Sequence, residues 1–373
     1  MMPIVVKMLL LIVLLSNILI PQTAVRGVWL TNVDSDVLLS KEKIDEAVAF
    51  CDSLGMNSIF VVVWNKGMTM FPSKVAEEFF GTKIDPVYGN RDPLLELINA
   101  AHLKKIKVFA WFEFGFASSY NENGGNILKK YPHWAAKDKN GNLAVKNNFE
   151  WMNGFHPEVQ DFMLRLIAEV VTNYPVDGIQ GDDRLPAMPS LAGYDDYTVT
   201  RYQKQFGSLP PTNEKDSAWV QWRSDILTDF MGRIYGTVKS IRKDVLVSMA
   251  PSIFPWSKEE YLQDWVKWMQ LGYVELLCPQ VYRYSISEYT SALSTIIREQ
   301  VPAEQLHRFY PGVLIKVGKY YPDSQFLSEM IEANRAHGIP GEVFFFYEGL
   351  KKFPLEFRNN FYKIPVTFPE LLH

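Results

Sequence analysis

Three carboxylates stand where apolar stretches of the sequence end. Asp182 and Asp183 follow the apolar part of VDGIQGDDRLPAM and precede Arg184, and Glu113 lies within the aromatic run FAWFEFGF. Hydrolysis of a glycosidic bond needs two carboxyl groups, one to protonate the leaving oxygen and one to attack the anomeric carbon or activate water. We therefore predict Asp182 as nucleophile or base and Glu113 as proton donor, with Asp183 and Arg184 orienting the site.

The acidic segments also have a structural interpretation. The tripeptide DDR can be a solvated turn with a surface salt bridge, a kind of contact that contributes little to stability. Neighbouring residues on a strand face opposite sides, so Asp182 and Asp183 should not both point inward. Glu113 fits the structural interpretation less well, because burying an acid among aromatic rings is costly. Burial should raise the pKa of Glu113 and suit it to proton donation.

The elements that would position these acids repeat one unit, a short apolar run followed by an amphipathic helical pattern. We predict strands at 26–32, 58–65, 107–114, 176–181, 245–252, 273–282, 309–315 and 342–349. Near-continuous apolar runs indicate strands buried on both faces, and eight of them alternating with helices predict a closed TIM (β/α)8 barrel of the α/β class. An open doubly wound sheet is disfavoured, because no glycine-rich phosphate turn follows the first strand.

The chain shows no composition break that would divide it. We expect a single barrel domain with inserted loops over 26–355 and a short tail over 356–373. The stretch that precedes the paired acids should be the fourth of eight parallel strands. Barrel enzymes keep their active sites at the carboxyl ends of the strands, which is where all three acids would then lie.

Other polar and aromatic residues follow the same predicted strands. The predicted substrate-binding residues are Asn65, Trp64, Arg184, Trp256, Gln280, Tyr282 and Glu348. The polar ones would bind sugar hydroxyls, and the tryptophans would stack on sugar rings, whose C–H surfaces are apolar. Ordinary packing explains each tryptophan equally well. An acid at a helix start explains Glu348 equally well.

Other chemistries fit the sequence less well. The six histidines show no pair at metal-ligand spacing, and neither G-x-S-x-G nor a phosphate loop occurs. Lys66 and Lys316 follow strands, but substrate binding explains them as well as Schiff-base chemistry does. We expect no metal and no cofactor. Cys51 and Cys278 stand in apolar settings and are predicted as buried thiols. The net charge of -4 argues against nucleic-acid binding, which needs a basic stripe.

The first residues have the layout of a secretory signal. Lys7 precedes an apolar run over 8–20, and Pro21 ends it. We expect 1–25 to be a signal peptide, or an uncleaved membrane anchor, outside the barrel core. Export to the periplasm, cell envelope or medium would follow. A start placed upstream of a cytosolic domain is the remaining explanation.

Seven segments resemble those of a known family in the same order: RGVWLTN, GMNSIFVVVWNKG, AWFEFGF, NGFHPEVQDFMLRLIAEVVTNYPVDGIQGDD, VSMAPSIFPWSKEEYLQDWVKW, CPQVYRY and GEVFFFYEGL. The likeness, from about Arg26 to about Leu350, is to the glycosyl-hydrolase-like family ten, formerly domain of unknown function 187, in its cyanobacterial form. The resemblance implies a TIM-barrel hydrolase of glycosidic bonds that is exported or envelope-associated. It also implies that relatives act on peptidoglycan glycan strands.

Two positions depart from the family pattern. Gly181 stands where relatives usually carry a bulky aromatic residue, and Arg184 stands where His or Tyr is commoner. We therefore expect a roomier pocket floor and a different substrate.

These observations predict an exported glycoside hydrolase that cleaves O-glycosidic bonds of a polysaccharide, with peptidoglycan glycan strands as a candidate substrate. The alternative is a non-catalytic glycan-binding barrel of the cell envelope, because fold does not settle function. The two differ in geometry. A hydrolase needs two carboxyl groups roughly 5 to 9 Å apart at one cleft, whereas a binding barrel needs only aromatic faces and hydrogen-bonding groups.

Overall fold

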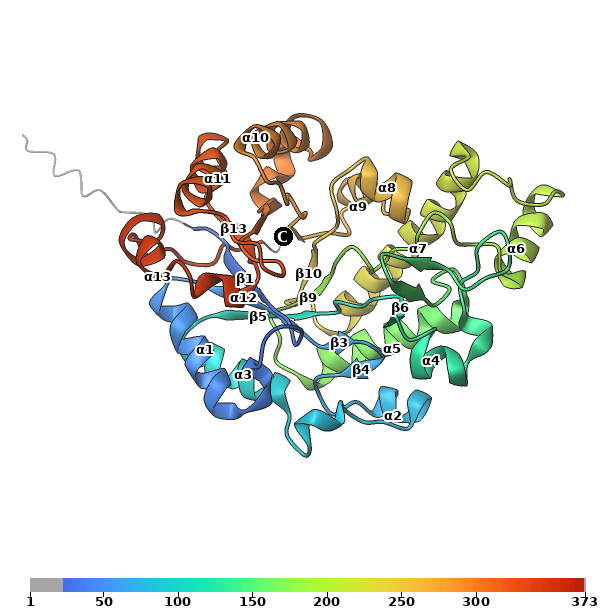
Figure 1. Ribbon diagram of the computed structural model, residues 1–373, viewed down its shortest axis with the longest axis horizontal. Helices are drawn as coiled ribbons and strands as arrows, with labels where there is room; N and C mark the ends of the chain where they lie inside the picture. Colours follow the sequence, from blue (N-terminus) through green and yellow to red (C-terminus); the bar gives the residue numbers. More distant parts are fainter. Residues whose placement is uncertain (1–22, 372–373) are drawn as a thin grey trace, which may run out of the picture.

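The computed structural model describes residues 23–371, so residues 1–22 of the predicted signal or anchor lie outside the described part. Within residues 23–371, eight parallel strands form one sheet in the order β11-β10-β9-β5-β2-β1-β13-β12 (Figure 1). These strands are β1 (Arg26–Leu30), β2 (Ser58–Val62), β5 (Lys107–Trp111), β9 (Gly178–Gly181), β10 (Leu246–Met249), β11 (Leu276–Leu277), β12 (Gly312–Leu314) and β13 (Glu342–Phe345).

Two parallel bridges close this sheet into a barrel. Leu277 pairs with Phe309 and Gln280 pairs with Gly312, which joins β11 to the chain of β12. The strands neighbour one another in chain order, and β9 lies between β5 and β10. The predicted barrel and the place of β9 as its fourth strand are confirmed.

Helices follow the barrel strands and surround them (Figure 1). They are α1 (Lys41–Ser53), α3 (Pro93–Leu103), α5 (Pro157–Asn173), α7 (Ser217–Ile241), α9 (Trp265–Gln270), α10 (Ile286–Thr295), α11 (Ser324–Ala336), α12 (Tyr347–Leu350) and α13 (Pro354–Glu356). The sequence marks their ends. Before α1, the hydroxyl of Ser40 accepts a hydrogen bond from Lys43 N at 3.2 Å, and Gly55 turns the chain after it with a φ of 78°.

Inserted segments extend the carboxyl ends of several strands. The hairpin β3 (Trp64–Asn65) and β4 (Met68–Thr69) with α2 (Lys74–Phe80) follows β2. An antiparallel sheet and a helix follow β5, namely β6 (Ala117–Tyr120), β7 (Val145–Lys146), β8 (Phe149–Trp151) and α4 (Gly125–Lys130). Helices α6 (Asp196–Phe206) and α8 (Trp256–Tyr261) follow β9 and β10. In Figure 1, α4 and α6 lie on the side away from α1 and α13.

A column of aromatic rings fills the barrel. Trp29 contacts Phe60 with ring centroids 5.8 Å apart, Phe60 stacks on Phe109 at 4.6 Å, and Phe109 contacts Phe368 at 6.0 Å. Phe60 and Phe109 are fully buried. Because Phe368 belongs to the C-terminal tail, the tail packs against the amino end of the barrel.

The beginning of the described chain joins the tail at this amino end. Thr23 pairs with Thr367 in a parallel bridge, and Ala24 N donates to Thr367 O at 3.0 Å. Ala24 and Val25 are fully buried. The expectation that all residues before Arg26 lie outside the barrel core is therefore wrong for these two. Of the helices in residues 23–371, none combines the length and the apolar character that a membrane crossing requires.

Candidate active site

A pocket of about 260 Å³ opens at the carboxyl ends of the barrel strands. Its polar lining consists of Asp182, Asp183, Arg184 and Gln280. Its aromatic lining consists of Trp29, Trp111, Tyr282, Tyr284 and Phe345. The paired acids thus lie in an aromatic-walled pocket at the end of the barrel where such folds place their chemistry.

Asp182 and Asp183 lie in the turn that follows β9 rather than on the strand. The strand ends at Gly181, and Leu185 N donates to Asp182 O at 3.4 Å. The alternation of side chains along a strand does not apply within a turn. Both aspartates therefore line the pocket, and the prediction that they could not both face inward is wrong.

Two glycines allow this turn to pack closely against neighbouring backbone. Gly115 has a φ of 48°, and a Cβ atom there would lie 2.1 Å from Arg184 O. A Cβ atom on Gly181 would lie 2.3 Å from Leu185 O and 3.0 Å from Met249 Sδ. Backbone and sulfur fill the space that an aromatic side chain would need. The expected roomier pocket floor at Gly181 is therefore wrong.

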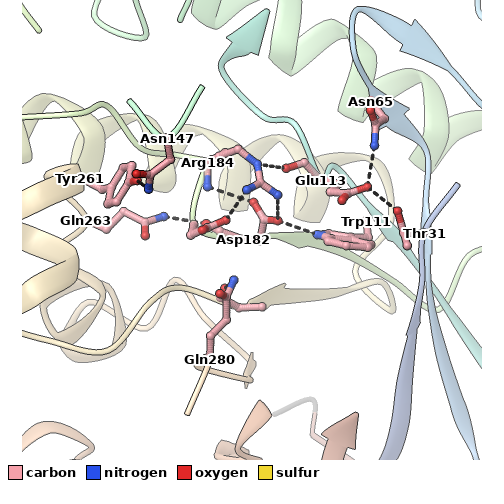
Figure 2. Close-up of polar contacts among 12 residues, drawn as sticks. Thr31, Asn65, Trp111, Glu113, Asn147, Asp182, Arg184, Tyr261, Gln263 and Gln280 are labelled. Carbon is pink, nitrogen blue, oxygen red and sulfur yellow. Dashed lines mark hydrogen bonds and ion pairs between the residues drawn. The ribbon is translucent and has the colours of Figure 1, made fainter. Parts of the chain in front are cut away.

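Asp182 is held on both carboxylate oxygens (Figure 2). Trp111 Nε1 and Arg184 Nη2 donate to Oδ2 at 3.1 and 3.0 Å, and Arg184 N donates to Oδ1 at 2.9 Å. The residue is only 2% exposed. Burial raises its pKa well above the ordinary value, the guanidinium of Arg184 opposes this effect, and the negative charges of Asp183 and Glu113 reinforce it.

Arg184 is shared among the acidic residues. Besides Asp182, its Nη1 lies 3.0 Å from Asp183 Oδ1, and its Nε donates to the backbone oxygen of Glu113 at 2.7 Å. Figure 2 shows the guanidinium between Asp182 and Glu113. The side chain of Asp183 is 22% exposed, so Asp183 is the more accessible of the paired acids.

Glu113 adjoins this network from the end of β5. Its Oε2 accepts hydrogen bonds from Asn65 Nδ2 at 2.7 Å and from Thr31 Oγ1 at 3.0 Å. Burial raises the pKa of Glu113, as predicted, and the charge of Arg184 opposes the rise. The amide of Asn65 therefore binds Glu113. Neither Asn65 nor Glu113 is among the residues that line the pocket.

The remaining predicted substrate contacts divide into two groups. Gln280 and Tyr282 line the pocket, and Gln280 Nε2 donates to Ala250 O at 3.1 Å. Glu348 lies at the start of α12, where its Oε2 is 2.6 Å from Lys351 Nζ. Glu348 is thus engaged by its own helix, as the helix-start explanation expects.

The two tryptophans predicted to stack on sugars lie elsewhere. Trp64 is fully buried, with its ring 6.3 Å from that of Phe80 and 5.4 Å from that of Phe162. No face of Trp64 is open to a sugar, which contradicts its predicted role. Trp256 is 43% exposed on α8, beside Tyr261 and away from the pocket lining.

Sequence reasoning missed much of the aromatic wall. Trp29, Trp111, Tyr284 and Phe345 line the pocket but were not predicted. Trp111 stands two residues before Glu113, so strand alternation would have placed it on the same side as that acid. Trp29 carries no such signal, because it is one of several apolar residues in a strand that is buried throughout.

The described residues show no arrangement typical of a metal site or of a disulfide. Within residues 23–371, no group of three or more His, Cys, Asp and Glu residues is arranged to hold a metal ion. Cys51 and Cys278 are buried and form no disulfide, as predicted. Burial raises the pKa of the Cys51 thiol to about 12.

Comparison with known sequences identifies the family. Residues 24–316 match the family described as Glycosyl hydrolase-like 10. The chain belongs to this family. The resemblance predicted from the seven segments is confirmed.

Two glycosyl hydrolases are similar to this chain at low sequence identity. The chain is 25% identical over 285 residues to the glycosyl hydrolase DigH of Escherichia coli, covering 69% of this chain and 62% of DigH. It is 23% identical over 394 residues to the glycosyl hydrolase YngK of Bacillus subtilis, covering 93% of this chain and 73% of YngK. The chain thus spans less than two thirds of the length of DigH.

Solved structures share the fold at low sequence identity. The glycoside hydrolase domain of PgaB (BpsB) from Bordetella bronchiseptica matches 89% of this chain and 96% of its own, with a TM-score of 0.64 and 13% identity. Alpha-L-fucosidase isoenzyme 2 from Paenibacillus thiaminolyticus matches 90% of this chain and 49% of its own, with a TM-score of 0.62 and 18% identity. The chain therefore shares the fold of these two proteins.

Proposed function

We propose that the protein is a glycoside hydrolase that cleaves O-glycosidic bonds of a polysaccharide. One observation carries the proposal. The carboxyl groups of Asp182 and Asp183 share the guanidinium of Arg184, which also binds the backbone oxygen of Glu113, beside an aromatic-lined pocket. Family membership and the barrel architecture support the same reaction class.

In this proposal Asp183 is the nucleophile or base. It lines the pocket, and its carboxylate is more exposed than that of Asp182. Asp182 has donors on both oxygens, so its suitable role is to fix Trp111 and Arg184. The role first predicted for Asp182 therefore passes to its neighbour.

Glu113 is the proposed proton donor. The carboxyl groups of Asp182, Asp183 and Glu113 interact electrostatically with one another and with a single guanidinium, so the cluster carries excess negative charge, which favours retention of a proton within it. Glu113 Oε2 accepts from Asn65 and Thr31, whereas no hydrogen bond to its Oε1 is recorded within residues 23–371. A proton on Oε1 would displace no existing contact. The leaving oxygen of the substrate would have to approach from the Arg184 side.

The proposed substrate is a glycan strand. Tyr282, Tyr284 and Phe345 provide partly exposed aromatic surface of the kind on which pyranose rings stack. Gln280 and Arg184 provide donors for sugar hydroxyls. Family resemblance makes denuded peptidoglycan strands the first substrate to test.

Export is part of the proposal. The run over 8–20 after Lys7 has the pattern of an export signal. Fusion of residues 1–30 to a reporter that is active only outside the cytoplasm tests this directly. Reporter activity supports export, and a reporter that stays inactive although it is synthesised contradicts it.

The activity is tested with purified full-length wild type, Asp183→Asn and the distant surface variant Lys105→Glu. Each is incubated with denuded peptidoglycan strands and with a panel of polysaccharides, and new reducing ends are counted. We expect Asp183→Asn to lose about 10⁴-fold in rate, or roughly 5.4 kcal/mol of transition-state stabilisation. Lys105→Glu should cleave like wild type.

Two outcomes would overturn parts of this proposal. Equal cleavage by wild type and folded Asp183→Asn would return the catalytic role to Asp182. If wild type binds glycans by calorimetry but releases no reducing ends from any of them, the barrel is a glycan-binding module.

A further inference from the structure

A second pocket lies at the opposite end of the barrel. It has a volume of about 640 Å³ and lies between the start of β1, the turns that follow α1 and α3, and the C-terminal tail. Its charged lining consists of the basic residues Arg26, Lys104, Lys105, Lys107 and Arg358 and the acid Asp52. The chain as a whole has a net charge of -4. This end of the barrel therefore concentrates positive charge on an acidic protein.

Only part of this positive charge is neutralised. Lys104 Nζ lies 3.1 Å from Asp52, and Lys107 Nζ lies 2.8 Å from Asp177. Arg358 donates to the backbone oxygen and the hydroxyl of Ser53, both uncharged. Within the described residues, Arg26, Lys105 and Arg358 form no ion pair with an acid.

Arg26 is the least satisfied of these cations. It is only 5% exposed, and its Nε and Nη1 atoms are buried without a hydrogen-bond partner within residues 23–371. Its guanidinium lies 4.1 Å from the ring centre of Tyr362. Buried polar groups are nearly always paired, because leaving a buried donor unpaired is costly. The side chain of Arg26 lines the pocket, so its positive charge acts on an anion held there, although its Nε and Nη1 atoms are themselves covered by protein.

Helix ends do not explain the cluster. The carbonyl ends of α1 and α3 face this side and favour cations such as Lys104 and Lys105. Arg26 is on a strand and Arg358 is in the tail, so neither is placed there by an interaction with the carbonyl end of its own helix. The charge of the nearby acid Glu342 favours the charged form of Arg26, but the Glu342 carboxylate forms its ion pair with Arg335 and not with Arg26.

We propose that this pocket binds a phosphate group, with Arg26, Lys105 and Arg358 as the residues that hold it. The planar guanidinium matches phosphate oxygens in pairs, and a phosphate can balance more than one cation. Tyr362 and Phe368 line the same pocket and offer apolar surface for the rest of the ligand. The ligand is thus a phosphate ester with an apolar portion.

The position of the pocket suggests one source of that ester. Thr367 lines the pocket and pairs with Thr23, so the predicted signal or anchor segment joins the barrel beside it. A phospholipid headgroup would lie at this end if the segment is held in a membrane. A soluble phosphate ester is the other source, and the two are separated by the probes below.

The test is calorimetric titration of the full-length protein with inorganic pyrophosphate and with short-chain phosphatidylglycerol and phosphatidylcholine below their micelle concentrations. The variants are Arg26→Gln, Lys105→Glu and Arg358→Gln. The matched control is Lys267→Glu, an exposed lysine on α9. We expect wild type and the control to bind pyrophosphate equally, and each pocket variant to bind about tenfold more weakly, as the loss of one charge-assisted contact would produce. Glycan cleavage should be unchanged.

The outcomes are distinguishable. Phosphatidylglycerol binding that pyrophosphate displaces, with none for phosphatidylcholine, identifies a lipid headgroup as the source. Pyrophosphate binding alone identifies a soluble ester. If neither phosphate probe binds, or if Lys267→Glu weakens binding as much as Lys105→Glu and Arg358→Gln do, the proposal is wrong. The last two variants alter exposed residues, so the test stands even if Arg26→Gln fails to fold.

Discussion

The two ends of the barrel use buried carboxylates in opposite ways. At the amino end, Glu342 is fully buried and accepts hydrogen bonds from Arg335, Asn334 and Tyr362. A second cation, Arg26, lies near it without an ion-pair partner. At this end, the single carboxylate of Glu342 thus accepts hydrogen bonds from three side chains, and a second arginine lies beside it. At the carboxyl end, Asp182 and Asp183 pair with one arginine, whose charge also acts on the carboxyl group of Glu113.

This difference distinguishes a carboxylate that stabilises the fold from the carboxylates to which we assign catalytic roles. A carboxylate with all its hydrogen bonds made, such as Glu342, has nothing left to offer a substrate. The side chain of Asp183, by contrast, is partly exposed, and Glu113 lies in surroundings that favour its protonated form. The imbalance of charge at the carboxyl end is therefore the better indicator of function than burial alone.

The largest effect should come from removing the shared arginine. Arg184→Met leaves Asp182 buried without its cation, and breaking a buried ion pair in this way costs about 3 kcal/mol of unfolding free energy. Urea unfolding measures the loss. The double variant Asp182→Asn with Arg184→Met should recover most of it, because the carboxylate that is most deeply buried beside Arg184 is then removed, whereas the side chain of Asp183 is 22% exposed. Equal stability of the single variant and wild type would show that Arg184 does not hold the turn.

The next effect concerns the proposed proton donor. Glu113→Gln keeps the shape of the side chain but removes the transferable proton, which should lower kcat/KM by about 10²-fold. The alkaline decline of the pH–rate profile should disappear as well, because it reports deprotonation of the acid. If the variant keeps both wild-type activity and that decline, the donor is Asp182.

The same substitution at the amino end should give the opposite result. Glu342→Gln weakens charge-assisted hydrogen bonds to Arg335 and should cost about 2 kcal/mol of unfolding free energy. Glycan cleavage by the folded variant should match wild type. If Glu342→Gln loses most of its glycan cleavage but none of its stability, the amino end of the barrel is not purely structural.

The smallest effect is a gain in stability. Because burial raises the folded-state pKa of Glu113, its contribution to stability is fully present below the unfolded-state pKa and is lost as pH rises through the folded-state value. Glu113→Gln should therefore be modestly more stable than wild type at pH 7, with the difference gone near pH 4. Urea unfolding at both pH values checks this. A variant less stable than wild type at pH 7 would contradict it.

The fold could be predicted from sequence because its signals are local. Buried parallel strands appear as apolar runs, and caps such as Ser40 and Gly55 mark where a helix begins and ends. Strand lengths were predicted less well. The run over 273–282 forms the short strand β11 (Leu276–Leu277) and, beyond Pro279, which has no N–H to donate, only an isolated bridge from Gln280 to Gly312.

Sequence predicted the site residues only where their position depends on the end of a single strand. The positions of Asp182 and Glu113 follow from the barrel rule. Contacts between separate loops do not follow from this rule. Nothing near Gly115 in the sequence shows that Arg184 O fills the place of its Cβ, and nothing near Trp64 shows that Phe80 and Phe162 cover its ring.

The pairing of Thr23 with Thr367 has a consequence for the order of events during synthesis. Phe368, whose ring contacts that of Phe109, follows the last barrel strand, β13, in the chain. The contacts that cover the amino end of β1 therefore join segments that are far apart in sequence, and such contacts are slow to form. During synthesis, β1 leaves the ribosome long before the segment that covers its end, so the amino end of the barrel stays open until the residues after β13 have been made.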